Sequence, residues 1–197
     1  MPSPLGHALG GIIAGVLVHR AVGEASPGVE PARGVGSWRW PAPAAACAAW
    51  RAIPADVRLF AWLGMAADLD FFIGRHSRET HSIGATAIVG AGLWLFTRRP
   101  RVAASGAAAY ASHILLDWLG SDTVPPIGIM ALWPVTGDFY QSSLFVFDAI
   151  SRRVLDWHAW VHNAGAVARE VVILAPILAV TLAVWPGWKK LRPVAGR

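Results

Sequence analysis

The sequence predicts an all-α protein, a multi-pass transmembrane helical bundle with about five membrane segments. Hydrophobic residues make up 55% of the 197-residue chain and charged residues only 15%, whereas a soluble domain has about a quarter of its residues charged. The apolar residues also come in blocks, as membrane helices require. The 11 tryptophans suit the two interfaces of a bilayer, because indole combines an apolar ring with one N–H donor. Tryptophans packed in a soluble core are the alternative.

The predicted membrane segments are short and rich in glycine and alanine. They lie at roughly Leu5–Val22, Val57–Ile73, Ile83–Phe96, Val102–Leu119 and Val171–Trp188. Several are somewhat shorter than the ~20 residues that a spanning helix prefers. Small residues let helices approach closely in lipid, and Gly-Xaa-Xaa-Xaa-Gly patterns start at Gly6 and Gly11. We therefore expect a compact bundle.

Two longer connections separate these segments. Gly23–Pro54 is rich in Pro, Gly and Ala and predicts a loop of low order. Gly120–Glu170 contains two Pro-rich turns and then a more helical run from Phe145 to Arg169, and we expect it to cap the bundle or lie at the interface. Residues 1–135 are thus predicted to form a membrane-embedded core. Residues 136–197 are predicted to form an interfacial helical region and a C-terminal membrane helix.

Basic clusters predict the orientation in the membrane. Arg98–Arg101 and Lys189–Arg192 are the strongest, and the positive-inside rule places both, with the C-terminus, in the cytoplasm of an inner-membrane protein. The N-terminus, the Gly74–Ser82 turn and the Gly120–Glu170 region then lie outside. These clusters account for the net charge of +5, so we expect a lipid bilayer and no nucleic acid as partner. Cys47 is the single cysteine, so a bound metal would need His and carboxylate ligands.

Seven ionisable side chains fall at the outward ends of the predicted segments or in the outward turn. They are His7, Asp68, Asp70, His76, His81, His113 and Asp117. Ionisable groups in membrane segments are costly and are functional candidates by default. Because the orientation was derived from Arg and Lys alone, the shared location of these seven residues is a separate observation.

Spacing favours a metal site for several of them. Asp68 and Asp70 cannot share one face of a regular helix, so the helix is expected to end or loosen there, and two such close carboxylates favour a cation. His113 and Asp117 are one helical turn apart, as a ligand pair or as a histidine oriented by its carboxylate. A solvated helix end is the alternative for the aspartates.

The turn His76–Ser82 places two histidines close together before the third segment. Imidazole is a common zinc ligand, and Arg78 is a candidate for binding an anionic substrate. Solvated histidines are the alternative for this turn. His7 is a candidate ligand only because the other six residues are predicted near it. His158 and His162 suit an interfacial helix as well as a ligand pair. His19 is predicted at the opposite face, in a structural role.

The order of these motifs resembles the YdjM-type family of membrane-bound metal-dependent hydrolases, which is more distantly similar to zinc-dependent phospholipases C. The matching residues are His7 after Met-Pro-Ser-Pro, Asp68-Leu69-Asp70, His76 with Thr80-His81-Ser82, Ser112–Asp117 and, more weakly, Thr123–Pro134. The resemblance covers roughly residues 1–135. It departs where the family commonly has a basic residue directly after the first histidine of the turn, because Ser77 stands there and Arg78 follows it.

The resemblance implies a hydrolase without naming its substrate. We expect the seven residues to hold one or two divalent ions, with zinc favoured and manganese or magnesium as alternatives. Asp70 and Asp117 are each candidates for the base instead of a ligand, and the sequence does not distinguish these roles. The substrate is expected to be an ester or phosphoester of a lipid or lipid-linked compound. A divalent-metal transporter and a non-catalytic membrane scaffold are the competing hypotheses. The sequence leaves the oligomeric state open.

Overall fold

The computed structural model describes residues 1–24, 53–73, 76–153 and 155–183, and these residues form an all-helical structure. Its elements are α1 (Pro4–Glu24), α3 (Ala55–Met65), the 3-10 helix η1 (Ala66–Ile73), α4 (Ile83–Thr97), α5 (Pro100–Leu119) and α6 (Trp157–Ala183). Within the described ranges there are two isolated β-bridges and no strand. The predicted all-α class is confirmed for this part of the chain. Most of the loop predicted at Gly23–Pro54, with Cys47, and the basic tail Lys189–Arg192 lie outside the described residues.

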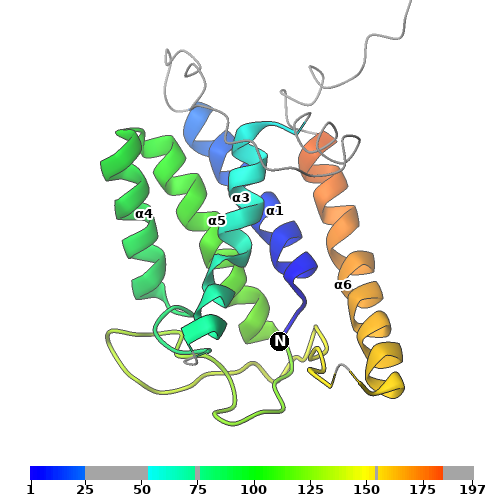
Figure 1. The fold of residues 1–197 in the computed structure, drawn as a ribbon. Helices are drawn as coiled ribbons and strands as arrows, with labels where there is room; N and C mark the ends of the chain where they lie inside the picture. Colours follow the sequence, from blue (N-terminus) through cyan, green and yellow to red (C-terminus); the bar gives the residue numbers. More distant parts are fainter. Residues whose placement is uncertain (25–52, 74–75, 154, 184–197) are drawn as a thin grey trace, which may run out of the picture.

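The helices form a bundle in which α1, α3 and α5 lie between α4 and α6 (Figure 1). Helix α1 packs against α3, α5 and α6, and α4 packs against α5. Buried apolar side chains from three helices meet in the middle, where Val16 of α1 contacts Val57 and Phe60 of α3 and Ala109 of α5.

Two predicted segments differ from the helices in their boundaries. Val57–Ile73 is an α-helix only as far as Met65 and continues as η1, so the helix does loosen at the aspartates as predicted. The last segment begins at Trp157, well before the predicted Val171. The Asp156 side chain accepts a hydrogen bond from the backbone N–H of His158 (2.9 Å), as N-cap residues do. The prediction of a more helical run from Phe145 to Arg169 is therefore confirmed from Trp157 onward and wrong before it, because the helix begins only at Trp157.

Glycine allows α1 and α3 to touch backbone to backbone. A Cβ atom on Gly64 would lie 2.9 Å from the Cα of Gly11 and would overlap the carbonyl oxygen of His7. A Cβ on Gly11 would lie 2.8 Å from the Cα of Gly64, so neither position has room for a side chain. The close approach expected from the glycine pattern of the first segment is thus present, with α3 as the partner of α1.

We expect Gly64→Ala to lower the free energy of unfolding by about 1–3 kcal/mol, because α1 and α3 must move apart to admit the methyl group. Gly92→Ala is the matched control, since a Cβ on Gly92 of α4 meets no atom within 4 Å. It should leave stability unchanged or raise it by up to about 1 kcal/mol through helix propensity. Denaturant or thermal unfolding in detergent compares the two variants. Equal stabilities would contradict the close packing at Gly64.

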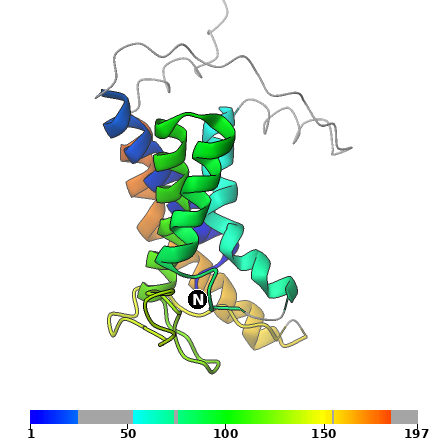
Figure 2. The same ribbon diagram turned by 90° about the vertical axis from the view of Figure 1, so that its left-hand side faces the viewer.

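The connection between α5 and α6 covers one end of the bundle, the end where the N-terminus lies (Figures 1 and 2). Backbone hydrogen bonds attach it to the start of α4, from Ile83 N to Ala131 O (2.9 Å) and from Gly84 N to Trp133 O (3.0 Å). The turn between α4 and α5, with Arg98, lies at the opposite end. Of the two expected arrangements, this connection therefore caps the bundle.

Two of the described helices are long and apolar enough to cross a membrane, α1 (Pro4–Val22) and α6, and α4 is a shorter apolar helix. The outer helices expose apolar side chains, such as Phe96 of α4 (92% exposed) and Val172 of α6 (72% exposed). Helix α3 has 11 residues, too few to span a bilayer alone. The five-span arrangement thus stays a prediction.

Candidate metal centre

Seven side chains from four parts of the chain meet at the capped end of the bundle. They are His7 of α1, Asp68 and Asp70 of η1, His76 and His81 of the following turn, and His113 and Asp117 of α5. The turn is fixed on both sides, because Tyr110 of α5 donates a hydrogen bond to the Thr80 carbonyl (2.6 Å) and Ser82 caps α4 by accepting from Ala85 N (3.0 Å). All seven residues singled out in the sequence are thus brought together.

Two imidazole nitrogens and two carboxylate oxygens form the middle of the cluster. His113 Nε2 lies 3.1 Å from His81 Nε2 and 3.1 Å from Asp117 Oδ2. His81 Nε2 lies 3.3 Å from the same oxygen of Asp117. Asp68 Oδ1 completes the group, 3.5 Å from His113 Nε2 and 3.7 Å from His81 Nε2. Each of the two nitrogens therefore faces three potential ligand atoms.

In each of these two rings, the contacts of Nδ1 indicate whether Nε2 carries a proton. His113 Nδ1 lies 2.7 Å from the Gly64 carbonyl oxygen. His81 Nδ1 lies 3.1 Å from the Thr80 hydroxyl oxygen and 3.2 Å from Asp70 Oδ2. Carbonyl and carboxylate oxygens only accept, and the Thr80 hydroxyl donates its one proton to Asp70, so both Nδ1 atoms donate. In the neutral rings each Nε2 then presents a lone pair. Four acceptor atoms consequently face one another, and only a cation between them, a proton or a metal ion, makes this arrangement favourable.

His7 and Asp117 contribute buried polar atoms that have no hydrogen bond. The His7 ring stacks on the His113 ring, with centroids 3.7 Å apart, and its Nε2 lies 3.3 Å from Asp117 Oδ1. The contact between His7 Nε2 and Asp117 Oδ1 lacks hydrogen-bonding geometry. Among the described residues, both ring nitrogens of His7 and both carboxylate oxygens of Asp117 are buried without a hydrogen-bond partner. An unsatisfied buried polar group costs about 1–3 kcal/mol. A metal ion bound to these atoms would remove that cost.

Asp70 is held by hydrogen bonds from the turn. Its Oδ1 accepts from His76 Nδ1 (2.8 Å), and its Oδ2 accepts from the Thr80 hydroxyl and lies 3.2 Å from His81 Nδ1. Both oxygens are therefore used within the described structure. In this arrangement Asp70 orients two histidines, as the carboxylate behind a metal-bound histidine commonly does.

The cluster attracts positive charge. It contains three carboxylates and four imidazoles and no lysine or arginine. Burial alone would lower the pKa of His81, but the carboxylates of Asp68 and Asp70 outweigh burial and raise that pKa. A metal ion in place of the proton would be stabilised by the same two carboxylates.

The residues fit a divalent ion. A zinc ion at about 2.0–2.1 Å from each ligand keeps neighbouring ligand atoms of a tetrahedron about 3.3 Å apart. The distances at the centre, from 3.1 Å to 3.7 Å, bracket that value. Three overlapping groups have the geometry to hold an ion: His7/His113/Asp117, Asp68/His81/His113 and Asp70/His76/His81. Because they share His81 and His113, the cluster suits one or two ions.

The remaining candidates from the sequence lie elsewhere. Arg78 is half-buried in the turn, and among the described residues no hydrogen bond or ion pair joins its guanidinium to the cluster. The side chain of His158 is 96% exposed, and His162 donates from Nε2 to the Ala149 carbonyl (2.8 Å). His19 lies 3.9 Å from Asp56 in the other half of the bundle.

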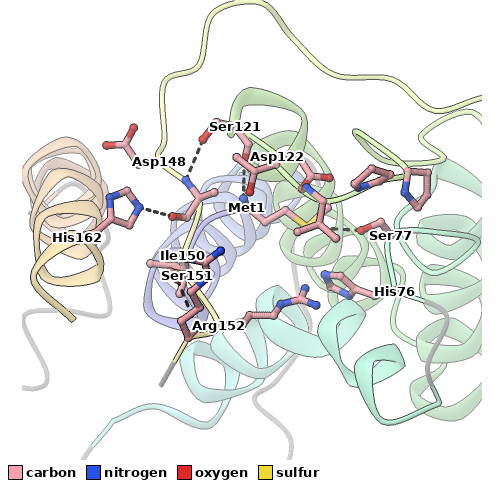
Figure 3. Close-up of a pocket in the computed structure, with 16 residues that line it drawn as sticks. Met1, His76, Ser77, Ser121, Asp122, Asp148, Ile150, Ser151, Arg152 and His162 are labelled. Atoms are coloured by element: carbon pink, nitrogen blue, oxygen red, sulfur yellow. Dashed lines mark hydrogen bonds between the residues drawn. The ribbon is translucent and has the colours of Figure 1, made fainter. Parts of the chain in front are cut away.

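Two groups that support the cluster could not be assigned this role from the sequence. The Gly64 carbonyl orients His113, but a backbone oxygen has no sequence signature. Thr80 is part of the matching motif Thr80-His81-Ser82, and the structure adds that its hydroxyl donates to Asp70. A cavity of about 590 Å³ lies beside the cluster, with His76 in its wall (Figure 3).

A family model described as YdjM inner membrane protein matches residues 1–190. The chain belongs to the YdjM inner membrane protein family. The match reaches beyond residue 135, where the recognisable motifs end, and includes α6 with the whole capping connection. No curated protein and no solved structure matches the chain.

Membership in this family indicates that a lipid bilayer surrounds the bundle. A YdjM inner membrane protein with apolar outer faces on α4 and α6 is a membrane protein, as the composition predicted. The family description names a location and no reaction.

Proposed function

We propose that this YdjM family member is a membrane-bound metal-dependent hydrolase that acts on an ester or phosphoester of a lipid or lipid-linked substrate. The observation that carries the proposal is the buried pair of His81 Nε2 and His113 Nε2, which lie 3.1 Å apart and each lie 3.1 Å to 3.7 Å from one oxygen of Asp117 and one of Asp68. A scaffold would gain nothing from such a costly arrangement in its buried interior.

His81, His113, Asp68 and Asp117 would hold the principal ion, and His7 would bind with Asp117 Oδ1. Nitrogen and oxygen ligands at this spacing favour zinc, with manganese or magnesium as alternatives. When bound, a divalent ion supplies a Lewis acid that acidifies water and stabilises a developing oxyanion. Asp70 fixes the tautomer of His81, and Gly64 fixes that of His113.

Among the three carboxylates, Asp68 is the best placed to accept a proton from water, through its second oxygen while Oδ1 faces His81 and His113. Its side chain is 31% exposed, whereas those of Asp70 and Asp117 are at most 1% exposed. Asp70 also uses both oxygens in hydrogen bonds with the turn. The role of base, which the sequence suggested for Asp70 or Asp117, is therefore better assigned to Asp68.

The location of the cluster supports a lipid substrate at the outer face of the membrane. The cluster lies at the end of the bundle opposite the Arg98–Arg99 turn, which the positive-inside rule places in the cytoplasm. A five-span topology, in which α3 with η1 and α5 also cross, would put it outside. Transport is the weaker alternative, because within the described ranges all three potential metal groups lie at one end.

The proposal is tested with detergent-purified protein that is stripped of metal and reloaded with zinc, manganese or magnesium. We expect hydrolysis of aryl phosphates or short-chain phospholipids to return with one of these ions. Asp117→Asn should lower the rate by at least about 100-fold, since even partners behind the ligands contribute about 10- to 100-fold. His158→Gln is the matched control and should retain full activity, because that histidine points into solvent.

Stoichiometric metal binding without hydrolysis of any ester would contradict the proposal. Flux of the same ion into proteoliposomes would then identify a transporter. Absence of bound metal in the wild-type protein would leave the scaffold hypothesis.

A further inference from the structure

The cavity beside the metal cluster is built from the cap of the bundle. Its wall is formed by the start of the chain, the turn at His76 and Ser77, the loop 121–126, residues 148–153 and His162. Its volume of about 590 Å³ is within the range of about 300–1,000 Å³ typical of small-molecule sites. His76 belongs both to this wall and to the cluster, so a molecule in the cavity is adjacent to the metal centre.

One arginine extends across this cavity. Arg152 comes from the segment before α6, and its guanidinium reaches toward His76 (Figure 3). Its Cζ lies 5.0 Å from the centre of the Phe71 ring on η1, and that ring meets the His76 ring edge to face with centroids 6.3 Å apart. Stacking on an aromatic ring holds the planar guanidinium in place while leaving its N–H donors free for a ligand.

The acidic residues of the wall are already paired with other groups. Asp148 binds Arg169 through both oxygens (3.0 Å each), and Asp122 accepts from the backbone N–H groups of Val124 (3.1 Å) and Gly128 (3.2 Å). Among the described residues no carboxylate lies within ion-pair distance of Arg152. The cavity thus presents a positioned guanidinium whose charge is not neutralised.

We propose that this cavity binds the phosphate group of an amphiphilic substrate, with Arg152 as the anion-binding residue. The inference rests on the proposed hydrolase function and adds the place and the chemistry of substrate binding. A guanidinium binds phosphate in a bidentate way, and the cluster beside it supplies the site at which a bond to that phosphate would be cleaved. Arg152 takes the role that the sequence suggested for Arg78.

The surroundings of the cavity favour a substrate with an apolar part. Phe72 (84% exposed) follows Phe71 on η1, and Leu155 (99% exposed) and Trp157 (74% exposed) follow the segment of Arg152. In an inner membrane protein such exposed residues belong in the interfacial region, with Trp at the level of the lipid headgroups. A phosphate in the cavity would therefore lie at headgroup depth.

The test measures binding separately from hydrolysis. Short-chain phosphatidic acid, short-chain phosphatidylcholine and inorganic phosphate are titrated into detergent-purified wild-type protein, Arg152→Gln and Arg98→Gln, with metal content determined for each. Arg98 is the matched control, because it is an exposed arginine that also stacks on an aromatic ring (5.7 Å from Trp94) but lies at the opposite end of the bundle. Arg152→Gln should weaken phosphatidic acid binding about tenfold or more at unchanged metal content.

The outcomes separate this inference from the proposed function. Tighter binding of phosphatidic acid than of inorganic phosphate identifies an amphiphile as the source, and equal binding identifies the phosphate group alone. Equal affinities of wild-type protein and Arg152→Gln, or an equal loss in Arg98→Gln, would overturn the assignment. Intact Arg152-dependent binding without turnover would instead count against hydrolysis only.

Discussion

Replacing His113 by alanine is expected to reduce bound metal to less than about a tenth of the wild-type amount. His113 Nε2 is within 3.5 Å of atoms from His81, Asp117 and Asp68, and its ring also stacks on His7. Two of the three groups that could hold an ion, His7/His113/Asp117 and Asp68/His81/His113, therefore include this side chain. Metal analysis of the purified protein after dialysis against zinc measures the effect.

The same variant should lose the thermal stabilisation that metal provides. A ligand present at about 100 times its dissociation constant stabilises the folded state by about 2.7 kcal/mol. Added zinc should thus raise the melting temperature of the wild-type protein and leave that of His113→Ala unchanged. This readout separates loss of the ion from general destabilisation, because it compares each protein with itself.

Two further variants make the result specific. Asp117→Asn keeps the size of the side chain and removes the charge, so it should lose metal even if the alanine variant is too unstable to purify. His19→Ala removes a partly buried histidine that contacts Phe60 in the other half of the bundle, and it should retain full metal content. Retention of metal by both His113→Ala and Asp117→Asn would reject the metal centre.

The candidate site followed from the sequence because polar groups are rare and costly in an apolar chain. Asp68 and Asp70 stood out at the end of an apolar segment, and His113 and Asp117 stood out at helical spacing within another. Arg and Lys then predicted which ends of the segments lie together. Periodicity and charge are thus sufficient to predict that all seven residues lie at one end of the bundle.

The sequence could not indicate how the seven residues divide their roles. Whether Asp70 faces an ion or the back of His81 depends on the path of the turn, which Tyr110 and Thr80 fix through hydrogen bonds across the fold. Arg152 could not be distinguished from other exposed arginines, because its contact with Phe71 joins residues far apart in the chain. Such long-range contacts leave no pattern in a single sequence.

The sequence places Glu170 in the outward region, because it predicts that the last membrane segment begins at Val171. The structure places it inside α6 with no exposed surface. Its side chain accepts hydrogen bonds from the backbone N–H of Ser3 (2.7 Å) and from the Ser3 hydroxyl, which in turn accepts from Gly6 N (3.2 Å). A carboxylate at this end of α1 also interacts favourably with the helix dipole. Glu170 therefore anchors the start of the helix that positions His7.

We expect Glu170→Ala to lower the free energy of unfolding by about 2–4 kcal/mol, because two buried donors of Ser3 lose their acceptor. His7 lies one turn after Ser3, bonded to it from its backbone N–H to the Ser3 carbonyl (3.1 Å), so metal affinity should fall as well. Unfolding in detergent with and without zinc, together with metal titration, measures both effects.

Glu170→Gln separates anchoring from simple loss of a buried side chain. The glutamine oxygen can still accept from Ser3 N, and its amide can donate to the Ser3 hydroxyl, so this variant should lose only about 1 kcal/mol and keep its metal. Thr181→Ala removes another buried polar group of α6, one bonded within its own helix to the Ile177 carbonyl (2.8 Å), and should not change metal affinity. If Glu170→Ala bound zinc as tightly as Thr181→Ala, Glu170 would stabilise the bundle without positioning His7.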